Sequence, residues 1–353
     1  MDINVIKQSM NKLLDKDFIT ALFNQRLAEF YPDFQELVKV DFHTNKKHTG
    51  KNSMIVVVEY VLTYLSKDGT SQQMNLFASA HSDGSRVRAF YGQNYLYQHG
   101  FDQGEFLVGR PLFYLEEQYA FFYQAVLGRT LRKLIKQDIE LDFSKTLDLS
   151  ARWIKKLHTS SVDSGHEFKK FHVREMSPKP QRFIADLTAS FPELGQRLER
   201  AFGRLAELQE KNSHLYQAVL IHGDYHPENI IFKSSELDKI KVIDFTDLAI
   251  GDPMVDLGSF IQQFDFMCFQ ILDRKKINSL KINFLEDYFL EKFENIDIQY
   301  INRINFFQAW VVMRTILMLF YAKSAKHPLN DLVGEIEQYL RLAEDNERKI
   351  NLY

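Results

Sequence analysis

Apolar residues recur at helical spacing over residues 5–30 and at strand spacing in the segments that follow. The first pattern predicts an amphipathic helix that ends near Tyr31 and Pro32. The strand-like segments are 37–44, 54–65, 72–81 and, for one or two further strands, 112–126. Between the second and third lies Ser66-Lys67-Asp68-Gly69, a turn sequence that predicts an antiparallel hairpin. Helical spacing returns at 87–98.

Beyond Gly128 the pattern is mainly helical. The predicted helices are 131–136, 146–158, 182–189 and 193–211, with four more between Met254 and the end of the chain. Short apolar strands are predicted at 218–221, 230–232 and 240–244. The pattern therefore predicts a bilobal α+β protein. Its parts are a small antiparallel-sheet lobe over 1–122, a hinge at 123–128 and a large, mainly helical lobe over 129–353.

Composition narrows the class of protein. The 353 residues include 44 Lys and Arg against 47 Asp and Glu, which gives a formal net charge of −3. This balance disfavours a dedicated nucleic-acid binder, which normally carries a clear basic excess. The single cysteine, Cys268, excludes an intramolecular disulfide and a zinc site built from several thiolates. Aromatic residues make up 14% of the chain, and core packing explains most of them.

The location of the protein is predicted from two segments. The N-terminal residues lack the basic and then apolar pattern of a signal peptide. The most apolar late segment, 306–322, is interrupted by Gln308 and Arg314, so it is predicted to be a buried helix rather than a membrane span. We therefore expect a cytoplasmic protein without membrane contact.

Candidate chemistry lies where two apolar strands border a polar loop. Residues 219–221 lead into a loop that contains Asp224 and Asn229, and a later apolar run ends at Asp244. Carboxylate and amide oxygens suit Mg²⁺, which neutralises nucleotide phosphates in phosphoryl transfer. A further carboxylate can accept the proton of an acceptor hydroxyl or orient its oxygen. Each fragment alone is a common turn or helix cap, but the ordered set favours phosphoryl transfer.

The same residues resemble the aminoglycoside phosphotransferase/choline kinase superfamily, the small-molecule relatives of protein kinases. The matching motifs are His222-Gly223-Asp224-x-x-x-x-Asn229, Ile243-Asp244-Phe245 and Gly251-Asp252-Pro253-x-x-Asp256-Leu257-Gly258. The last motif is more similar to aminoglycoside and fructosamine kinases than to choline kinases. The resemblance implies a protein-kinase-like fold along almost the whole chain, although the specific motifs occupy only residues 219–258.

The resemblance implies roles for residues of the catalytic loop and the motif after it. Asp224 is implied to be the catalytic base, and Asn229 and Asp244 are implied to bind magnesium. His222 and His226 belong to the catalytic loop, where we expect them to support its structure rather than to transfer protons.

The resemblance also covers the next helix and the hinge. Asp252 and Asp256 are similar to residues that cap the following helix and brace the loop. The segment 121–126 is similar to the hinge strand, which implies that the backbone at Tyr123 and Ala125 reads the adenine edge.

The N-terminal lobe departs from the family pattern. The family has a lysine on the third strand that binds the nucleotide phosphates and pairs with a glutamate on the next helix. Ser79 stands at the lysine position, and residues 86–98 contain no carboxylate, with Gln93 as the nearest polar substitute. Either another cation reaches the phosphates, or transfer from ATP is weak or lost. The candidate cations are Lys46, Lys47 and Lys51 of the segment 44–53, and Arg86 and Arg88 of the helix. We assign Lys51 and Ser79 to the nucleotide site; the other interpretation of segment 44–53 is a solvated basic turn.

We therefore predict a magnesium-dependent kinase that transfers the γ-phosphate of ATP or GTP to a hydroxyl of a small molecule, such as an amino-sugar, an amino-alcohol or a sugar. The alternative is a catalytically weak or inactive nucleotide-binding protein, because both halves of the lysine–glutamate pair are absent.

A protein kinase is disfavoured, since only seven residues separate Asp244 from Asp252 and leave no activation segment. Charged residues on amphipathic helices are usually solvated. The acidic residues considered as a binding site for an amine-bearing acceptor are Asp256, Asp265, Glu286, Asp287, Glu335 and Glu337. The acceptor and the oligomeric state stay open.

Overall fold

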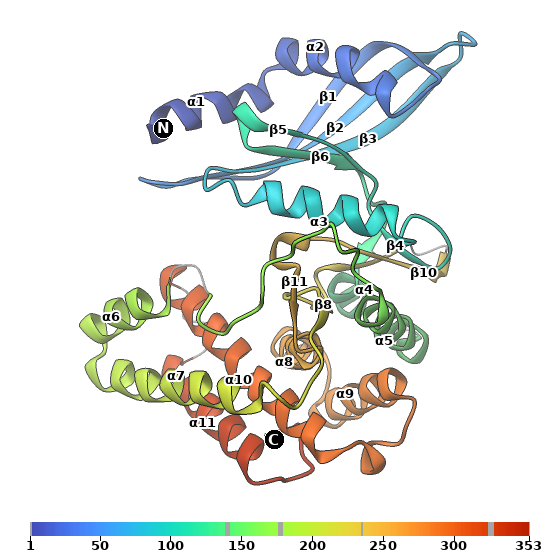
Figure 1. The fold of residues 1–353 in the computed structure, drawn as a ribbon. Helices are drawn as coiled ribbons and strands as arrows, with labels where there is room; N and C mark the ends of the chain where they lie inside the picture. The colour runs from blue at the N-terminus through green and yellow to red at the C-terminus, as the bar shows by residue number, and fades with distance from the viewer. Residues whose placement is uncertain (1, 138–141, 176–178, 234–235, 324–327, 353) are drawn as a thin grey trace. The chain divides into compact units, whose positions relative to one another are not determined.

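The computed structural model describes residues 2–137, 142–175, 179–233, 236–323 and 328–352. The chain divides into two compact units (Figure 1): Met1–Gly128 with Lys241–Asp247, and Arg129–Ile240 with Leu248–Tyr353. The sequence predicted a single change at 123–128. In the structure, residues 241–247 also belong to the first unit, because Phe245 is fully buried and the 3-10 turn that contains it packs against helix α3 (Arg86–Gln98).

The first unit is built around an antiparallel sheet. Its elements are α1 (Ile3–Asn11), α2 (Lys16–Arg26), β1 (Phe34–Thr49), β2 (Met54–Ser66), β3 (Ser71–His81), α3, β4 (Phe106–Val108), β5 (Pro111–Leu115) and β6 (Ala120–Gln124), with 3-10 turns at Lys12–Leu14, Leu27–Glu29, Glu116–Gln118 and Phe245–Asp247. The strand order is β1-β2-β3-β6-β5, and all neighbours pair antiparallel. The predicted β2–β3 hairpin is confirmed, and Gly69 has the positive φ of 80° that favours glycine in its turn.

The helix predicted over 5–30 is wrong as a single element. α1 ends at Asn11, a 3-10 turn follows, and α2 begins at Lys16. Asp15 is in the extended conformation, and its Oδ1 accepts hydrogen bonds from the N–H groups of Asp17 and Phe18. Asp15 therefore caps a new helix, a break that apolar spacing alone does not reveal.

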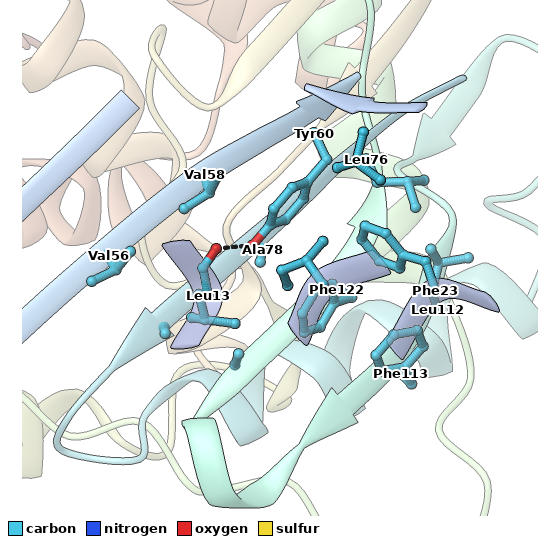
Figure 2. Close-up of a cluster of buried hydrophobic side chains, with 14 of the residues drawn as sticks. Leu13, Phe23, Val56, Val58, Tyr60, Leu76, Ala78, Leu112, Phe113 and Phe122 are labelled. Carbon is cyan, nitrogen blue, oxygen red and sulfur yellow. Dashed lines mark hydrogen bonds between the residues drawn. The ribbon is translucent and has the colours of Figure 1, made fainter. Parts of the chain in front are cut away.

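Alternate strand residues form a core against α1 and α2 (Figures 1 and 2). Val56 and Tyr60 of β2 are fully buried there, together with Phe23 of α2 and Phe122 of β6. The Tyr60 hydroxyl donates a hydrogen bond to the carbonyl of Leu13 at 2.7 Å, which ties the sheet to the break between α1 and α2. Because side chains alternate across a strand, the residues between these core positions face the other side of the sheet.

α3 packs against that other face. The rings of Phe90 on α3 and Phe121 on β6 meet edge to face, with their centroids 5.5 Å apart. Phe121 is the neighbour of the core residue Phe122, so the two rings lie on opposite faces of β6. Ser79 of β3 pairs in register with Phe121 and therefore lies on the α3 face as well.

The second unit is mainly helical. Its elements are β7 (Arg129–Thr130), α4 (Leu131–Gln137), α5 (Phe143–Thr159), α6 (Pro180–Ser190), α7 (Pro192–Asn212), β8 (Val219–Ile221), β9 (Ile230–Lys233), β10 (Glu236–Val242, whose last residues enter the first unit), β11 (Ala249–Gly251), α8 (Met254–Cys268), α9 (Arg274–Phe289), α10 (Ile298–Tyr321) and α11 (Leu329–Glu344), with a 3-10 turn at Phe293–Asn295. The four helices predicted after Met254 are confirmed as α8 to α11. Within the described ranges, α10 is long and apolar enough to cross a membrane, but most of it is buried inside the structure.

Candidate active site

The polar loop 222–229 connects β8 to β9 in the second unit. Leu220 and Ile221 of β8 are fully buried, and β8 pairs antiparallel with β11. Gly223 has a φ of 79°, a conformation that favours glycine, and the chain turns there. The apolar strand therefore fixes the position of the loop, and the glycine lets Asp224 follow directly after it.

Asp256, in the first turn of α8, anchors this loop. Its Oδ2 accepts a hydrogen bond from the N–H of His222 and its Oδ1 accepts one from the N–H of Gly223, both at 2.8 Å. Oδ2 also lies 2.9 Å from Nε2 of His158, whose Nδ1 lies 2.8 Å from the Tyr288 hydroxyl. Asp256 is fully buried, and a buried carboxylate with these partners restricts the loop backbone. The predicted bracing role of Asp256 is confirmed.

Asp252 lies two residues before the first residue of the same helix. Its Oδ1 accepts a hydrogen bond from the N–H of Met254 at 3.0 Å, and its Oδ2 lies 3.1 Å from Nε of Arg303. Both side chains are almost completely buried, and burial raises the pKa of Asp252 although Arg303 opposes the shift. Asp252 thus accepts from the N–H of the first residue of α8, although Pro253 occupies the N-cap position. Its partner Arg303 on α10 was not predicted from the sequence.

Asp224 is a partly exposed carboxylate of the loop, with 31% of its side chain accessible. Its Oδ1 accepts a hydrogen bond from Nη1 of Arg314 at 3.1 Å, and its Oδ2 lies 3.5 Å from Nε2 of His226. Burial acts to raise the pKa of Asp224, but Arg314, His226 and His222 outweigh it and hold the pKa below its usual range. The carboxylate is therefore ionised at neutral pH and can accept a proton.

The two histidines of the loop make contacts within it. His222 is fully buried, and its Nδ1 accepts a hydrogen bond from the N–H of Asp224 at 3.3 Å. Nδ1 of His226 accepts one from the N–H of Glu228 at 3.2 Å, and Nε2 of His226 lies 3.1 Å from Nδ2 of Asn229. These bonds order the residues on both sides of Asp224.

Asn229 ends the loop. Its Nδ2 donates to the carbonyl of Asp224 at 3.0 Å, and its backbone N–H donates to the carbonyl of His226 at 2.9 Å. Because the amide nitrogen is directed at the loop, the Oδ1 oxygen is turned away from it. An amide oxygen in this orientation is a suitable ligand for a hard cation.

Sequence analysis did not assign Arg314 to the site. Its Nη1 also donates to the carbonyl of Gly223 at 3.3 Å, and its guanidinium lies 4.9 Å from the centre of the Trp310 ring. The sequence signal was a charge inside an apolar helix, which we used only to argue against a membrane span. No spacing rule connects residues 224 and 314, so the pairing needed the tertiary structure.

Asp244 lies in the first unit, directly before the buried Phe245. Its φ is 65°, which is uncommon for a residue other than glycine. Its Oδ1 accepts hydrogen bonds from Nη1 of Arg86 at 3.0 Å and from the hydroxyl of Thr246 at 2.7 Å. Arg86, one of the cations considered from the sequence, thus forms an ion pair with Asp244.

The missing lysine–glutamate pair is not replaced at the expected positions. Ser79 is almost fully buried on the α3 face of β3 and carries no charge. Nε2 of Gln93 donates to the carbonyl of Gly109 at 2.8 Å. Gln93 as the nearest polar substitute stays a prediction.

Two hinge residues, Tyr123 and Ala125, interact with β3 of the sheet. The N–H of Ala125 donates to the carbonyl of Asn75 at 2.9 Å, so this N–H is not available to a base and only the Ala125 carbonyl remains. That the Ala125 backbone reads the adenine edge stays a prediction. Tyr123 pairs in register with Phe77, and their rings stack with centroids 5.7 Å apart.

Lys51 lies in the turn between β1 and β2. The segment 44–53 is not a loop throughout, because β1 continues to Thr49 and leaves only a short turn. Nζ of Lys7 on α1 donates to the carbonyls of Gly50 and Lys51 at 2.8 and 2.9 Å. α1 therefore holds this turn.

The carboxylates considered for an amine-bearing acceptor mostly have other partners. Asp265 forms ion pairs with Arg274 and with the buried Lys281, whose Nζ lies 2.9 Å from Oδ2 of Asp265. The remaining pairs are Glu286 with Lys292, Glu337 with Arg197, and Asp256 with the loop backbone. These ion pairs leave little support for an ammonium-binding pocket built from this set.

Comparisons with known proteins agree with this geometry. The model of the phosphotransferase enzyme family (APH) matches residues 79–276, more than half of the chain. An amicoumacin kinase solved with AMP-PNP, Ca²⁺ and Ami has a TM-score of 0.54 at 14% identity, covering 94% of this chain and 93% of its own. Choline kinase LicA of Streptococcus pneumoniae has a TM-score of 0.54 at 13% identity, covering 93% and 99%. ADP-bound aminoglycoside phosphotransferase APH(2'')-Ib has a TM-score of 0.52 at 15% identity, and the match covers 94% of this chain and 98% of that protein. At these identities the likeness shows the kinase-like α+β fold, which confirms the predicted fold class.

A curated relative matches a shorter part of the chain. Acyl-CoA dehydrogenase family member 10 of Mus musculus is 23% identical over 167 residues, which is 46% of this chain and 15% of the mouse protein. The chain therefore spans a small part of the length of that relative.

Proposed function

Because the chain belongs to the phosphotransferase enzyme family, we propose that it transfers the γ-phosphoryl group of ATP or GTP to a hydroxyl group of a small molecule. The observation that carries the proposal is the ionised carboxylate of Asp224 on a loop that Asp256 anchors from α8. A fixed, charged acceptor of protons beside a loop of this sequence suits in-line phosphoryl transfer.

In the proposed step the acceptor oxygen forms a bond to the γ-phosphorus, and the bond from that phosphorus to the bridging oxygen breaks, which releases the nucleoside diphosphate. Asp224 orients the acceptor hydroxyl and receives its proton, which then passes to solvent. Arg314 makes this carboxylate a weaker base, but the carboxylate remains the group that accepts the proton in the proposed step.

Asn229 and Asp244 are the proposed magnesium ligands. Each offers a hard oxygen: the amide oxygen of Asn229 is turned away from its loop, and the Asp244 carboxylate is held by Thr246. Among the residues that the structure describes, no group of three or more His, Cys, Asp or Glu side chains converges on a metal site, which fits a cation that completes its shell with phosphate and water oxygens. When bound, Mg²⁺ neutralises charge on the phosphate oxygens.

The nucleotide is proposed to lie against the α3 face of the first unit. The Ala125 carbonyl and the backbone of Tyr123 are the groups proposed to read its base, while Ser79 and Lys51 belong to the same site. We keep the expectation that the protein works in the cytoplasm, without a nucleic-acid or membrane partner.

An inactive nucleotide-binding protein is the second candidate, because Ser79 offers no charge and Gln93 is engaged elsewhere. Thermal denaturation with ATP, GTP and Mg²⁺ separates the two functions when it is combined with a product assay. A kinase is stabilised and forms product, whereas an inactive binder is stabilised and forms none. No stabilisation by any nucleotide contradicts both.

The proposed function is tested by Asp224→Asn. The amide cannot accept the hydroxyl proton, so we expect kcat to fall by about 10²- to 10⁴-fold with little change in the melting temperature. Release of ADP is measured with water alone and with choline, ethanolamine, streptomycin and neutral sugars as acceptors. Asp273→Asn is the control, because Asp273 only caps α9 and asparagine caps as well as aspartate. Equal turnover by Asp224→Asn and wild type contradicts the assignment of Asp224.

A further inference from the structure

Arg86, the first residue of α3, forms an ion pair with Asp244 inside the first unit. Its Nη1 lies 3.0 Å from Oδ1 of Asp244 and 3.0 Å from the hydroxyl of Thr246. The side chain of Arg86 is 13% exposed and that of Asp244 is 40% exposed. Within the described part of the chain, Nε of Arg86 is buried and has no hydrogen-bond partner. A guanidinium has five donors in a planar fork, so this one retains capacity for an oxyanion.

The ion pair conflicts with a metal ion that binds Asp244 by itself. A dication on this carboxylate would lie within a few ångströms of the guanidinium, and like charges at such distances repel. A ligand that brings a dication and an oxyanion together removes the conflict. Its metal can bind a carboxylate oxygen of Asp244, while an anionic oxygen of the same ligand accepts hydrogen bonds from the guanidinium of Arg86. A metal–polyphosphate complex has this pattern of charge.

The lysines of β1 are less suited to this position. Lys47 pairs in register with Val56, a core residue, so its side chain leaves the sheet on the face opposite to Ser79. Lys46 pairs with Val57, which pairs with Ser79, so Lys46 shares the α3 face. It is nevertheless exposed on an edge strand of the sheet, two strands away from Ser79.

Two further basic residues, Arg88 and His81, do not replace Arg86. Arg88 is exposed, although it lies on the same helix only two residues further on. His81 is uncharged at neutral pH, because burial and the neighbouring Arg86 lower its pKa to about 4. Arg86 therefore combines a partly buried charge, an unused donor and direct contact with the proposed metal ligand.

We propose that Arg86 binds the phosphate groups of the metal–nucleotide complex, and that the metal and the nucleotide therefore bind the first unit together rather than the metal first. This inference rests on the proposed function. It moves the phosphate-binding cation from β3, where Ser79 offers none, to the first turn of α3.

The test compares Arg86→Gln with Arg88→Gln in the full-length chain. Both substitutions remove one positive charge from α3, but only the first removes the partner of Asp244. Calorimetry measures binding of Mg·ATP, Mg·ADP and adenosine, and electron paramagnetic resonance measures binding of Mn²⁺ alone. We expect Arg86→Gln to lower the affinity for Mg·ATP and Mg·ADP by roughly 10- to 100-fold and to change the affinity for adenosine by less than about twofold. The affinity for Mn²⁺ alone should rise by roughly two- to tenfold. Arg88→Gln should bind all four as wild type does.

Arg86→Lys provides a variant that keeps the ion pair should the glutamine variant fold poorly, which circular dichroism reveals. Lysine retains the charge without the planar fork, so we expect intermediate Mg·ATP affinity and Mn²⁺ binding as weak as in wild type. A merely structural role for Arg86 predicts that adenosine and Mg·ATP lose affinity equally, and that Mn²⁺ binding does not tighten.

The outcomes separate the inference from the function on which it rests. If wild type binds neither adenosine nor Mg·ATP, the proposed function fails and the inference fails with it. If wild type binds Mg·ATP and either Arg86→Gln or Arg86→Lys binds both Mg·ATP and Mn²⁺ exactly as wild type does, only the inference is overturned. Equal weakening of adenosine and Mg·ATP overturns it as well.

Discussion

At the scale of single residues, the carboxylates of the motif differ because their surroundings differ. Asp256 is fully buried and bonded to two backbone N–H groups and a histidine, so it fixes the shape of the loop. Asp224 is partly exposed and paired with a guanidinium, so it stays ionised and can reach a ligand. Similar side chains thus take structural and chemical roles according to burial and partners.

Asp256→Asn tests the anchoring role. An amide offers only one acceptor oxygen, so one buried N–H of His222 or Gly223 loses its partner. We expect the free energy of unfolding to fall by about 2–4 kcal/mol, measured by urea denaturation, with a parallel loss of ATP turnover. Asp297→Asn is a matched control, because Asp297 caps α10 by accepting from the N–H of Gln299, and asparagine can do the same. If the two variants are equally stable, the Asp256 network does not hold the loop.

At the scale of elements, the position of the loop depends on how α8 packs against α10. The two helices approach closely at Gly258, where an added Cβ would lie 2.7 Å from Cβ of Phe307 and 3.0 Å from the carbonyl oxygen of Ile304. α8 carries Asp256, which binds the loop from one side, and α10 carries Arg314, which binds Asp224. The crossing at Gly258 therefore sets the distance between the two helices that hold the loop.

Gly258→Ala should push these helices apart. Overpacking at a backbone contact is expected to destabilise the protein by about 1–3 kcal/mol, although alanine is the better helix former. Gly203→Ala on α7 is the control, since no heavy atom lies within 4 Å of its added Cβ, and it should stabilise by about 0.5–1 kcal/mol. Thermal denaturation of both variants measures the difference. A stabilising Gly258→Ala would show that the helices tolerate the methyl group.

At the scale of the whole molecule, the chain forms two units, and one of them is discontinuous in sequence. The core between the sheet and the helices α1 and α2 is made from residues 6–122 alone. α3, in contrast, has contacts with a segment that is distant in sequence. Residues 241–247 pack against it and supply both Phe245 and Asp244. The first unit thus contains a sheet core that is local in sequence and a helix that depends on a distant segment.

Hydrogen exchange on a fragment of residues 1–128 tests this dependence. Without residues 241–247, α3 loses the cover of Phe245 and the ion pair of Arg86. We expect amides of 86–98 to exchange at least roughly tenfold faster than in the full-length chain, while amides of β2 and β3 change by much less. The full-length protein is the reference. Equal protection of α3 in both would show that the distant segment does not stabilise it.

Features that depend on neighbouring residues were predictable from the sequence. The β2–β3 hairpin follows from a four-residue turn signal between alternating strands, and α8 to α11 follow from long apolar periods. The break between α1 and α2 was missed, because the apolar spacing continues across it and the cap at Asp15 competes with helix continuation. The hydrogen bond from the N–H of Ala125 to the carbonyl of Asn75 was not predictable, because it joins segments fifty residues apart.

By itself, the sequence determined the fold class, the motif of Asp224, Asn229 and Asp244, and the absence of a lysine on the third strand, because each is written in residue types at short spacing. Only the tertiary structure decided which groups surround those carboxylates. Arg314 reaches Asp224 from 90 residues away and Arg86 reaches Asp244 from 158 residues away. Ion pairs of this kind form between surfaces that packing brings together, so the pattern of neighbouring residues does not predict them.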